Sequence, residues 1–587
     1  MMRLLVAWVP VTLLALLPAA DRGCPEDERL TRFFQDYLDR EFAARPLEAT
    51  RLGDHRFDAR LDDVFPKARE TWRTHYQQTL NNLSSKINKS QLSRDGQIDL
   101  EIFEHELRYR LWLLDNQRTF EQDPRVYNEY LSDSVYLLFA QSTLPAAQNV
   151  KNAIARLEFL PRIVAAAKAS LKNPPRVMVE TAIRQNQGAI NFYENGIYEL
   201  AGENKATSSL RPAASRSAAL LREYGQFLEK SVLPNATGDW RLGKEKFAAK
   251  LPLELNAGLT AEQVLADAEA EFARVQREMY VVARQLHHRT HPGKPLPPDD
   301  EAGRRETITR VLEVLNRDHG KGSELLAQAK EFSERIKTFI KSKDILRLPD
   351  PDRCRIIEMP EFQRGNSVAY LNPAPPLDPK ASSYYAISPP PGHWDARRQE
   401  SFLQEYNRYL MQLLTIHEAY PGHYVQLEYS NRHPSLIRRV LQSGVFAEGW
   451  AVYTEQMLVD QGYGEGDLAL RLNQLKWYLR AVANAILDYR MHCSDWTDEQ
   501  ALDLLVRQSY QSEGEAIGKI IRAKQSSCQL STYFVGRMAF YNLRQKIQRE
   551  QGEQFDLGRF HEAVLAHGTL PVKYLGELVP RRLKQPR

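Results

Sequence analysis

The chain has 587 residues, and its hydrophobic share of 43% is ordinary for a globular protein with a substantial core. Its 79 basic and 75 acidic residues leave a net charge of +4, and the charges are mixed along the chain. This balance gives no indication of nucleic acid or an anionic membrane surface as a partner.

The chain begins with the pattern of a secretory signal peptide. Arg3 is followed by the apolar run LLVAWVPVTLLALLPAA, which ends in small residues. A short basic start, an apolar middle and a small-residue end are typical of such a leader. We therefore expect residues 1–20 to be removed and residues 21–587 to be exported, to the periplasm or the medium. The alternative is an uncleaved membrane anchor.

After signal cleavage we expect no stable membrane span, because no later run is long and apolar enough. Lipid anchoring at Cys24 is not expected, because ADRGC lacks an apolar residue three positions before the cysteine. The other cysteines are Cys354, Cys493 and Cys528, with no C-x-x-C pair. Export would permit a disulfide, and Cys493 with Cys528 is the one pair we consider. The sequence does not decide whether it forms.

Most of the mature chain has helical patterns. Thr260 with Gln263 and Thr497 with Gln500 form capping-box patterns, each before a helical run. Three further runs predict long helices: residues 92–116, 177–200 and 323–342. A Pro/Gly-rich stretch, residues 287–303, predicts a surface loop between helices.

One segment, residues 354–394, has a different composition. It contains CRIIEMPEF, NSVAYLNP and SSYYAIS, which are short runs rich in strand-forming residues and separated by Pro and Gly. They predict a small antiparallel sheet of two or three strands. We expect residues 21–587 to form a large, mainly helical, channel-like domain, as one body or as two lobes. Its motif-bearing part would span about residues 354–587.

The stretch TIHEAYPGHYVQ resembles a zinc-binding H-E-x-x-H motif with a longer spacing. His417 lies on the inward face of a helix predicted from Phe402 to Tyr420, but the next histidine, His423, is six positions later. A regular helix would rotate that side chain away. Pro421 must break the helix, and Gly422 permits backbone angles closed to other residues, so this step can return His423 toward His417. Alternatively, the Pro-Gly pair merely ends the helix.

A third candidate ligand, Glu448, lies within VFAEGWAVYTEQML, which is apolar nearly all round. A carboxylate buried there must be protonated, paired or bound to a metal. It follows His423 by 25 residues, a separation that suits a helix–loop–helix return. Two imidazoles and a carboxylate with one open position are typical of catalytic zinc, and Glu418 would remain available as a general base.

Three blocks of the sequence, HEAYPGHYVQ, FAEGWAVYTEQM and LDYRMHCSDWTDEQA, resemble the family known as domain of unknown function 885. Its pattern is H-E-A-x-P-G-H, usually followed by a second histidine, and then E-G-W-A. The early block LEATRLGDHRFDARL is similar to the N-terminal part of that family, so the resemblance covers nearly the whole mature chain. Tyr424 stands where many members have the additional histidine.

These proteins look like distant relatives of gluzincin peptidases with helical, channel-shaped bodies. The resemblance implies that His417, His423 and Glu448 bind one zinc ion and that Glu418 is the general base. The late segment SSCQLSTYFVGRMAFYNLR resembles a family block and nominates Tyr533 to stabilise an oxyanion, with the following Gly536 allowing close packing. Alternatively, Tyr533 only packs its ring.

Three further residues are candidates for supporting a metal ligand or contacting substrate. Glu455, on the Glu448 side of its helix, could orient a ligand histidine. Asp488 and His492, spaced i,i+4, could support the site or touch substrate, or they could form an ordinary surface pair.

These observations predict an exported zinc-dependent peptidase that hydrolyses oligopeptides, with the small sheet binding substrate as an added strand. A second hypothesis is a non-catalytic helical peptide-binding protein with a structural metal. A third is that the same zinc site cleaves another amide or an ester. The sequence does not decide between endopeptidase and exopeptidase action, nor the oligomeric state.

Overall fold

Helices make up most of the computed structural model, which describes residues 24–202, 205–359 and 368–585. The predicted mainly helical class is confirmed. The predicted signal peptide, residues 1–20, lies outside the described residues. Across the described ranges, no helix combines the length and the apolar character that crossing a membrane requires.

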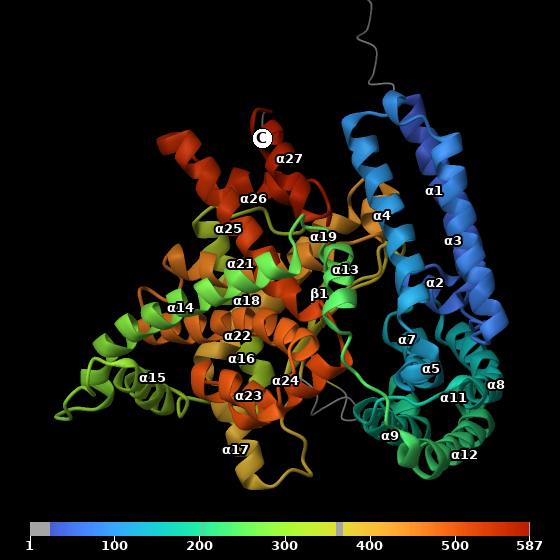
Figure 1. The fold of residues 1–587 in the computed structure, drawn as a ribbon, viewed down its shortest axis with the longest axis horizontal. Helices are drawn as coiled ribbons and strands as arrows, with labels where there is room; N and C mark the ends of the chain where they lie inside the picture. The colour runs from blue at the N-terminus through green and yellow to red at the C-terminus, as the bar shows by residue number, and fades with distance from the viewer. Residues whose placement is uncertain (1–23, 203–204, 360–367, 586–587) are drawn as a thin grey trace, which may run out of the picture.

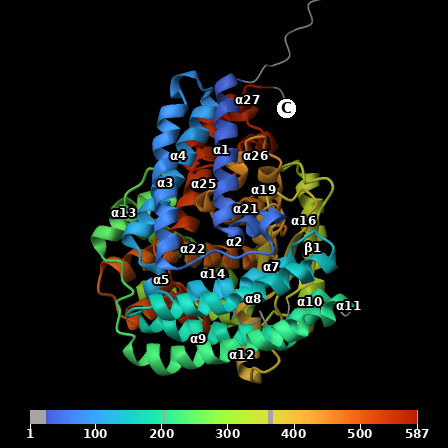
Figure 2. The same ribbon diagram turned by 90° about the vertical axis from the view of Figure 1, so that its right-hand side faces the viewer.

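The N-terminal helices gather on one side of the molecule, with α1, α3 and α4 side by side and α8, α9 and α12 crossing below them (Figures 1 and 2). They are α1 (Pro25–Ala44), α2 (Pro46–Leu52), α3 (Pro66–Lys86), α4 (Arg94–Asn116), α5 (Thr119–Gln122), α6 (Arg125–Asn128), α7 (Ser134–Ala140), α8 (Ala146–Ser170), α9 (Arg176–Asn191), α10 (Ile197–Ala201), α11 (Lys205–Ser208) and α12 (Arg211–Phe227).

The remaining helices form the other side, where α14 packs on α22 and α21 packs on α25 (Figure 1). Four precede the sheet: α13 (Lys244–Leu255), α14 (Ala261–Thr290), α15 (Glu301–Leu315) and α16 (Leu325–Ser342). The others follow it: α17 (Ala396–Glu405), α18 (Arg408–Glu418), α19 (His423–Asn431), α20 (Leu436–Val440), α21 (Gly444–Asp460), α22 (Leu468–Cys493), α23 (Asp498–Leu502), α24 (Glu513–Gln525), α25 (Thr532–Gln551), α26 (Leu557–Leu565) and α27 (Leu575–Leu583).

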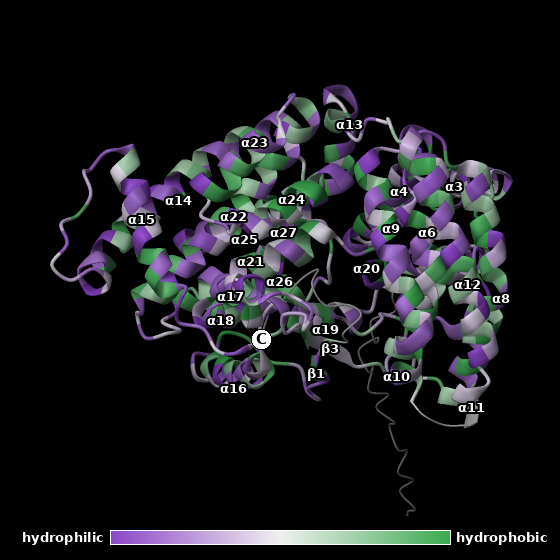
Figure 3. Ribbon diagram, turned by 90° about the horizontal axis from the view of Figure 1, so that it is seen from below, coloured by the Kyte–Doolittle hydropathy of each residue, from purple (hydrophilic) through white to green (hydrophobic). Residues whose placement is uncertain are grey.

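Both predicted capping boxes are confirmed: Thr260 caps α14 with Gln263, and Thr497 caps α23 with Gln500. The predicted loop is shorter than expected, because α14 continues to Thr290 and α15 begins at Glu301. The outer helices carry both purple and green residues in Figure 3, as expected of helices with one face on a core. The four cysteines are free, so the disulfide considered between Cys493 and Cys528 is not formed.

A close helix contact holds α21, the helix that carries Glu448, against α25. A Cβ atom added to Gly449 would lie 2.3 Å from backbone atoms of Gly536, and one added to Gly536 would lie 2.0 Å from the carbonyl oxygen of Val445. Only residues without side chains allow these two backbones to approach so closely. The predicted close-packing role of Gly536 is therefore confirmed.

The small sheet is mixed, so the prediction of an antiparallel sheet is wrong for one strand. Its strands are β1 (Cys354–Glu358), β2 (Ala369–Asn372) and β3 (Ser383–Ile387), in the order β1-β3-β2. β2 pairs antiparallel with β3, whereas β1 pairs parallel with β3. The chain between β1 and β3 includes β2 and is long enough for the crossover that a parallel pair needs. Strand composition alone does not indicate this direction.

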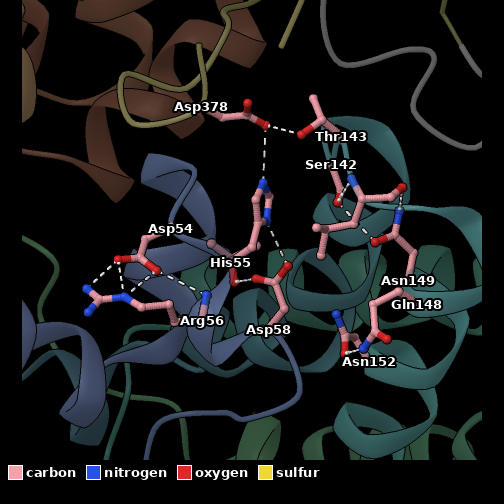
Figure 4. Close-up of polar contacts among 12 residues, drawn as sticks. Asp54, His55, Arg56, Asp58, Ser142, Thr143, Gln148, Asn149, Asn152 and Asp378 are labelled. Carbon is pink, nitrogen blue, oxygen red and sulfur yellow. Dashed lines mark hydrogen bonds and ion pairs between the residues drawn. The ribbon is translucent and has the colours of Figure 1, made fainter. Parts of the chain in front are cut away.

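A histidine links the N-terminal helices to the connection between β2 and β3 (Figure 4). His55 Nδ1 lies 2.8 Å from Asp58 Oδ2, and its Nε2 lies 3.2 Å from Asp378 Oδ2. Thr143 donates a 2.6 Å hydrogen bond to the same Asp378 oxygen. The hydrogen bond with Asp58 raises the pKa of His55, an effect that burial opposes and the contact with Asp378 reinforces. The early block GDHRFD therefore has a structural role in holding the sheet.

Candidate metal centre

The helix that carries the motif is shorter than predicted. The expected continuous helix from Phe402 to Tyr420 is divided, because α17 ends at Glu405 and α18 begins at Arg408. Asn407 caps α18, its side-chain oxygen accepting hydrogen bonds from the backbone N–H groups of Tyr409 and Leu410. α18 then ends at Glu418 and α19 begins at His423.

The Pro421-Gly422 step turns the chain between these two helices. The Gly422 N–H donates a 3.0 Å hydrogen bond to the carbonyl of Ile416. A Cβ atom on Gly422 would lie 1.9 Å from the carbonyl oxygen of His417, so this approach requires glycine. The indole Nε1 of Trp450, on α21, donates a 2.8 Å hydrogen bond to the carbonyl of Pro421 and holds the turn against that helix.

The turn brings three side chains to one point. The rings of His417 and His423 have centroids 4.7 Å apart and are nearly perpendicular, at 89°. Glu448 Oε2 lies 3.7 Å from Nε2 of His417 and 3.4 Å from Nε2 of His423. All three candidate ligand atoms lie within 4.8 Å of one another. The chain therefore does more than end a helix at the Pro-Gly pair.

The donor set fits a divalent metal ion. Glu448 Oε2 is buried and has no hydrogen-bond partner among the described residues, an arrangement that needs a compensating group. Burial would raise the pKa of Glu448, but the two imidazoles outweigh this and lower it, so the carboxylate is ionised. Two imidazole nitrogens and one carboxylate oxygen suit zinc, with a position left for water or substrate.

Glu455 holds His417 from the opposite side. It lies seven residues after Glu448 on α21, and its Oε1 is 2.6 Å from His417 Nδ1. The same oxygen accepts a 3.2 Å hydrogen bond from Trp477 Nε1. Although burial alone would lower the pKa of His417, the contacts with Glu448 and Glu455 raise it. A carboxylate on Nδ1 leaves Nε2 directed at Glu448, as in carboxylate–histidine–metal arrangements.

Glu418 directly follows the candidate ligand His417 and is held by the sheet. Its Oε2 accepts a 2.9 Å hydrogen bond from the backbone N–H of Leu371. Leu371 belongs to β2, an edge strand whose only partner in the sheet of described strands is β3. Nothing in the sequence of this strand indicates that its backbone would position a glutamate 47 residues later.

Tyr533 lies in the first turn of α25, and its hydroxyl accepts a 3.1 Å hydrogen bond from Arg522. Burial, reinforced by the charge of Glu448, raises the pKa of Tyr533 to about 12. The phenol therefore keeps its proton at neutral pH and retains a donor. Its helix, α25, packs on α21, the helix that carries Glu448.

Asp488 and His492 lie on α22 with other partners. Asp488 accepts 3.0 Å hydrogen bonds from the backbone N–H of Cys528 and the hydroxyl of Ser531. His492 Nδ1 accepts a hydrogen bond from the backbone N–H of Leu242. Both side chains are buried, so they are not the surface pair considered above. Among the described residues, neither belongs to the His-His-Glu group.

The burial of Asp488 gives a testable pH dependence. Burial raises its pKa from 3.8 to about 7, so between these values the unfolded chain releases a proton that the folded protein keeps. Stability should therefore fall as pH rises through this window. Asn cannot titrate, so the stability of Asp488→Asn relative to wild type should increase by a few kcal/mol, in order of magnitude, between pH 4.5 and 8. Urea midpoints at both pH values measure this, with the exposed Asp498→Asn as control. Equal pH dependence in Asp488→Asn and wild type would contradict the assignment.

A cavity of about 1420 Å³ lies between the N-terminal helices and the C-terminal part. Its lining includes Arg184 of α9, Tyr370 of β2, and Lys519 and Arg522 of α24. The three candidate ligands are not among its described lining residues. Two residues of the lining are instead connected with Glu418 and Tyr533. Tyr370 precedes Leu371, which holds Glu418, and Arg522 binds Tyr533.

The fold and the site define a large helical protein with a candidate His-His-Glu metal centre. The family described as bacterial protein of unknown function (DUF885) matches residues 46–579, and the chain belongs to this family. No curated protein matches the chain.

Two solved structures are similar over almost their entire length. One is described as a "putative lipoprotein of unknown function" from Shewanella oneidensis, with 29% identity, a TM-score of 0.78 and coverage of 93% of this chain and 99% of that one. The other, a "putative lipoprotein" from Colwellia psychrerythraea, has 18% identity, a TM-score of 0.77 and coverage of 96% and 100%. The second match shows the fold alone.

Proposed function

We propose that the protein is an exported zinc-dependent peptidase that hydrolyses oligopeptides. The observation that carries this proposal is the convergence of His417, His423 and Glu448, in which the Glu448 oxygen facing the two imidazoles has no hydrogen-bond partner among the described residues. A structural site would not need a further glutamate beside a ligand. Glu418 is such a group, held in place by a strand edge.

Each residue around the proposed zinc ion would have its own role in the hydrolysis. Zinc at such a site supplies Lewis acidity, which polarises a carbonyl group and acidifies water. Glu418 would accept the proton of the attacking water and deliver it to the departing amine. Tyr533, protonated at neutral pH, would donate a hydrogen bond to the developing oxyanion. Glu455 would keep His417 in the orientation that binds metal.

The shape of the surroundings supports a peptide as the substrate. The cavity lies between two groups of helices, which favours a short, extended peptide over a folded protein. The free edge of β2 faces Glu418 and could pair with such a peptide as an added strand. Binding would then displace Glu418 from the N–H of Leu371 and release it for proton transfer.

Export is part of the proposal. The leader pattern at residues 1–20 predicts it, and both similar structures are described as lipoproteins. We propose a cleaved leader without lipid at Cys24, whose thiol lies 3.0 Å from the carbonyl oxygen of Gln91.

Metal analysis of the purified protein, coupled to mass-spectrometric profiling of a peptide library, tests the function. We expect about one zinc per chain and cleavage of library peptides that a chelator abolishes and added zinc restores. The intact chain without chelator is the reference. Metal-loaded protein that cleaves nothing across a broad library would contradict the proposal.

A further inference from the structure

One face of helix α24 lines the cavity between the N-terminal helices and the C-terminal part. Glu515, Gly518, Lys519 and Arg522 all contribute to the lining, at the three- and four-residue spacing of a helix face. A Cβ atom added to Gly518 would meet nothing within 4 Å. The open space of the cavity therefore reaches the backbone of this helix.

Several cations along the cavity are already paired with carboxylates. Arg51 lies 2.8 Å from Glu129, and Arg480 lies 2.9 Å from Glu515. Arg125 likewise lies 2.6 Å from Asp123. The positive charge of these three arginines is already balanced by a carboxylate, so they would attract an anionic ligand only weakly.

Lys519 and Arg522 differ from these pairs. Lys519 is only 7% exposed, yet among the described residues it makes no hydrogen bond or ion pair. Arg522 donates to the amide oxygen of Gln529, at 2.9 Å, and to the hydroxyl of Tyr533, and it has no carboxylate partner in the described part of the chain. A buried cation without a partner is unfavourable unless a ligand compensates it.

One of the two cations contacts a proposed catalytic group. Arg522 contacts Tyr533 directly, and Glu448 interacts electrostatically with both Tyr533 and Lys519. Burial, together with the charges of Arg480 and Arg522, lowers the pKa of Lys519 well below its ordinary value. An anion bound in the cavity would relieve this repulsion.

We propose that Lys519 and Arg522 bind a carboxylate of the peptide substrate, so that the protein selects peptides carrying a negative charge near the scissile bond. This inference rests on the proposed peptidase function. The carboxylate has two sources, the C-terminus of the peptide or an acidic side chain. Both would receive charge-assisted hydrogen bonds from the same two cations.

Three matched N-acetylated peptides distinguish the sources: pentaalanine with a free C-terminal carboxylate, its C-terminal amide, and the amide with one alanine replaced by aspartate. Binding is measured by calorimetry to metal-loaded Glu418→Gln protein, and hydrolysis is measured with the wild type. We expect one of the charged peptides to bind about 10- to 100-fold more tightly than the neutral amide. Tighter binding of the free acid would identify the C-terminus as the source of the carboxylate. Tighter binding of the aspartate peptide would identify an acidic side chain.

Lys519→Met should remove this preference by raising KM and Kd for the charged peptide, whereas Lys519→Arg should retain most of it. Lys524→Met is the matched control, because Lys524 lies on the same helix, pairs with Asp498 and is not among the lining residues. The thermal midpoint of Lys519→Met should not fall, since the substitution removes a buried amino group that has no hydrogen-bond partner among the described residues.

The two proposals fail in different ways. Equal binding of all three peptides would overturn the carboxylate site, even if library peptides are cleaved. A preference for charged peptides that survives in Lys519→Met would overturn it as well. If no library peptide is hydrolysed, the peptidase proposal fails, while the calorimetric comparison still decides whether the cavity selects a carboxylate.

Discussion

Metal-loaded Glu418→Gln protein is expected to lose peptide hydrolysis by about 10²- to 10⁴-fold in kcat. Gln keeps an oxygen that can accept the hydrogen bond from Leu371, so the side chain should stay at the strand edge. What it loses is the ability to take a proton from water and return it to the leaving amine. Steady-state kinetics on a library-derived peptide, with zinc content measured on the same samples, gives the comparison.

The control separates proton transfer from general effects of removing a carboxylate. Glu400→Gln removes an exposed carboxylate from α17, where it contacts His319, and should leave kcat unchanged. Unaltered zinc content in Glu418→Gln is part of the expectation, because Glu418 is not one of the three converging ligands. Wild-type turnover in the zinc-loaded variant would remove Glu418 from the mechanism and favour a site of another kind.

The candidate ligands could be predicted from the sequence because local chain geometry brings them together. Pro421 and Gly422 lie between the two histidines and turn the chain there. Seven residues, close to two helical turns, separate Glu448 from Glu455, so both carboxylates approach the same histidine. Such relations depend on helix periodicity and on the backbone properties of proline and glycine.

Features that depend on distant parts of the chain could not be predicted in this way. The N–H of Leu371 reaches Glu418 only because the sheet packs against α18. His55 and Asp378 are 323 residues apart, and no local pattern pairs them. The parallel direction of β1 likewise depends on how the chain crosses the sheet. Asn407 is a typical N-cap residue and could have indicated the start of α18. The apolar periodicity continues on both sides of it, however, and predicted one unbroken helix.

Gly422→Ala is expected to lose most of its bound metal and to reduce peptide hydrolysis by about 100-fold or more. The new methyl group would lie 1.9 Å from the carbonyl oxygen of His417 and 2.3 Å from that of Ile416. Both are backbone atoms of the helix that ends beside the site, so no flexible side chain can move aside. The turn must open by an ångström or more, and His423 moves with it.

Gly444→Ala is the matched control, because a Cβ atom there, at the start of α21, would meet nothing within 4 Å. It should bind zinc and hydrolyse peptide like the wild type, while circular dichroism checks that both variants keep their helices. If Gly422→Ala instead retained full zinc and activity, His423 would reach His417 without the close backbone approach. The Pro-Gly turn would then no longer explain how a six-residue spacing forms a metal site. A folded Gly422→Ala protein without metal would show that the turn itself positions the second imidazole.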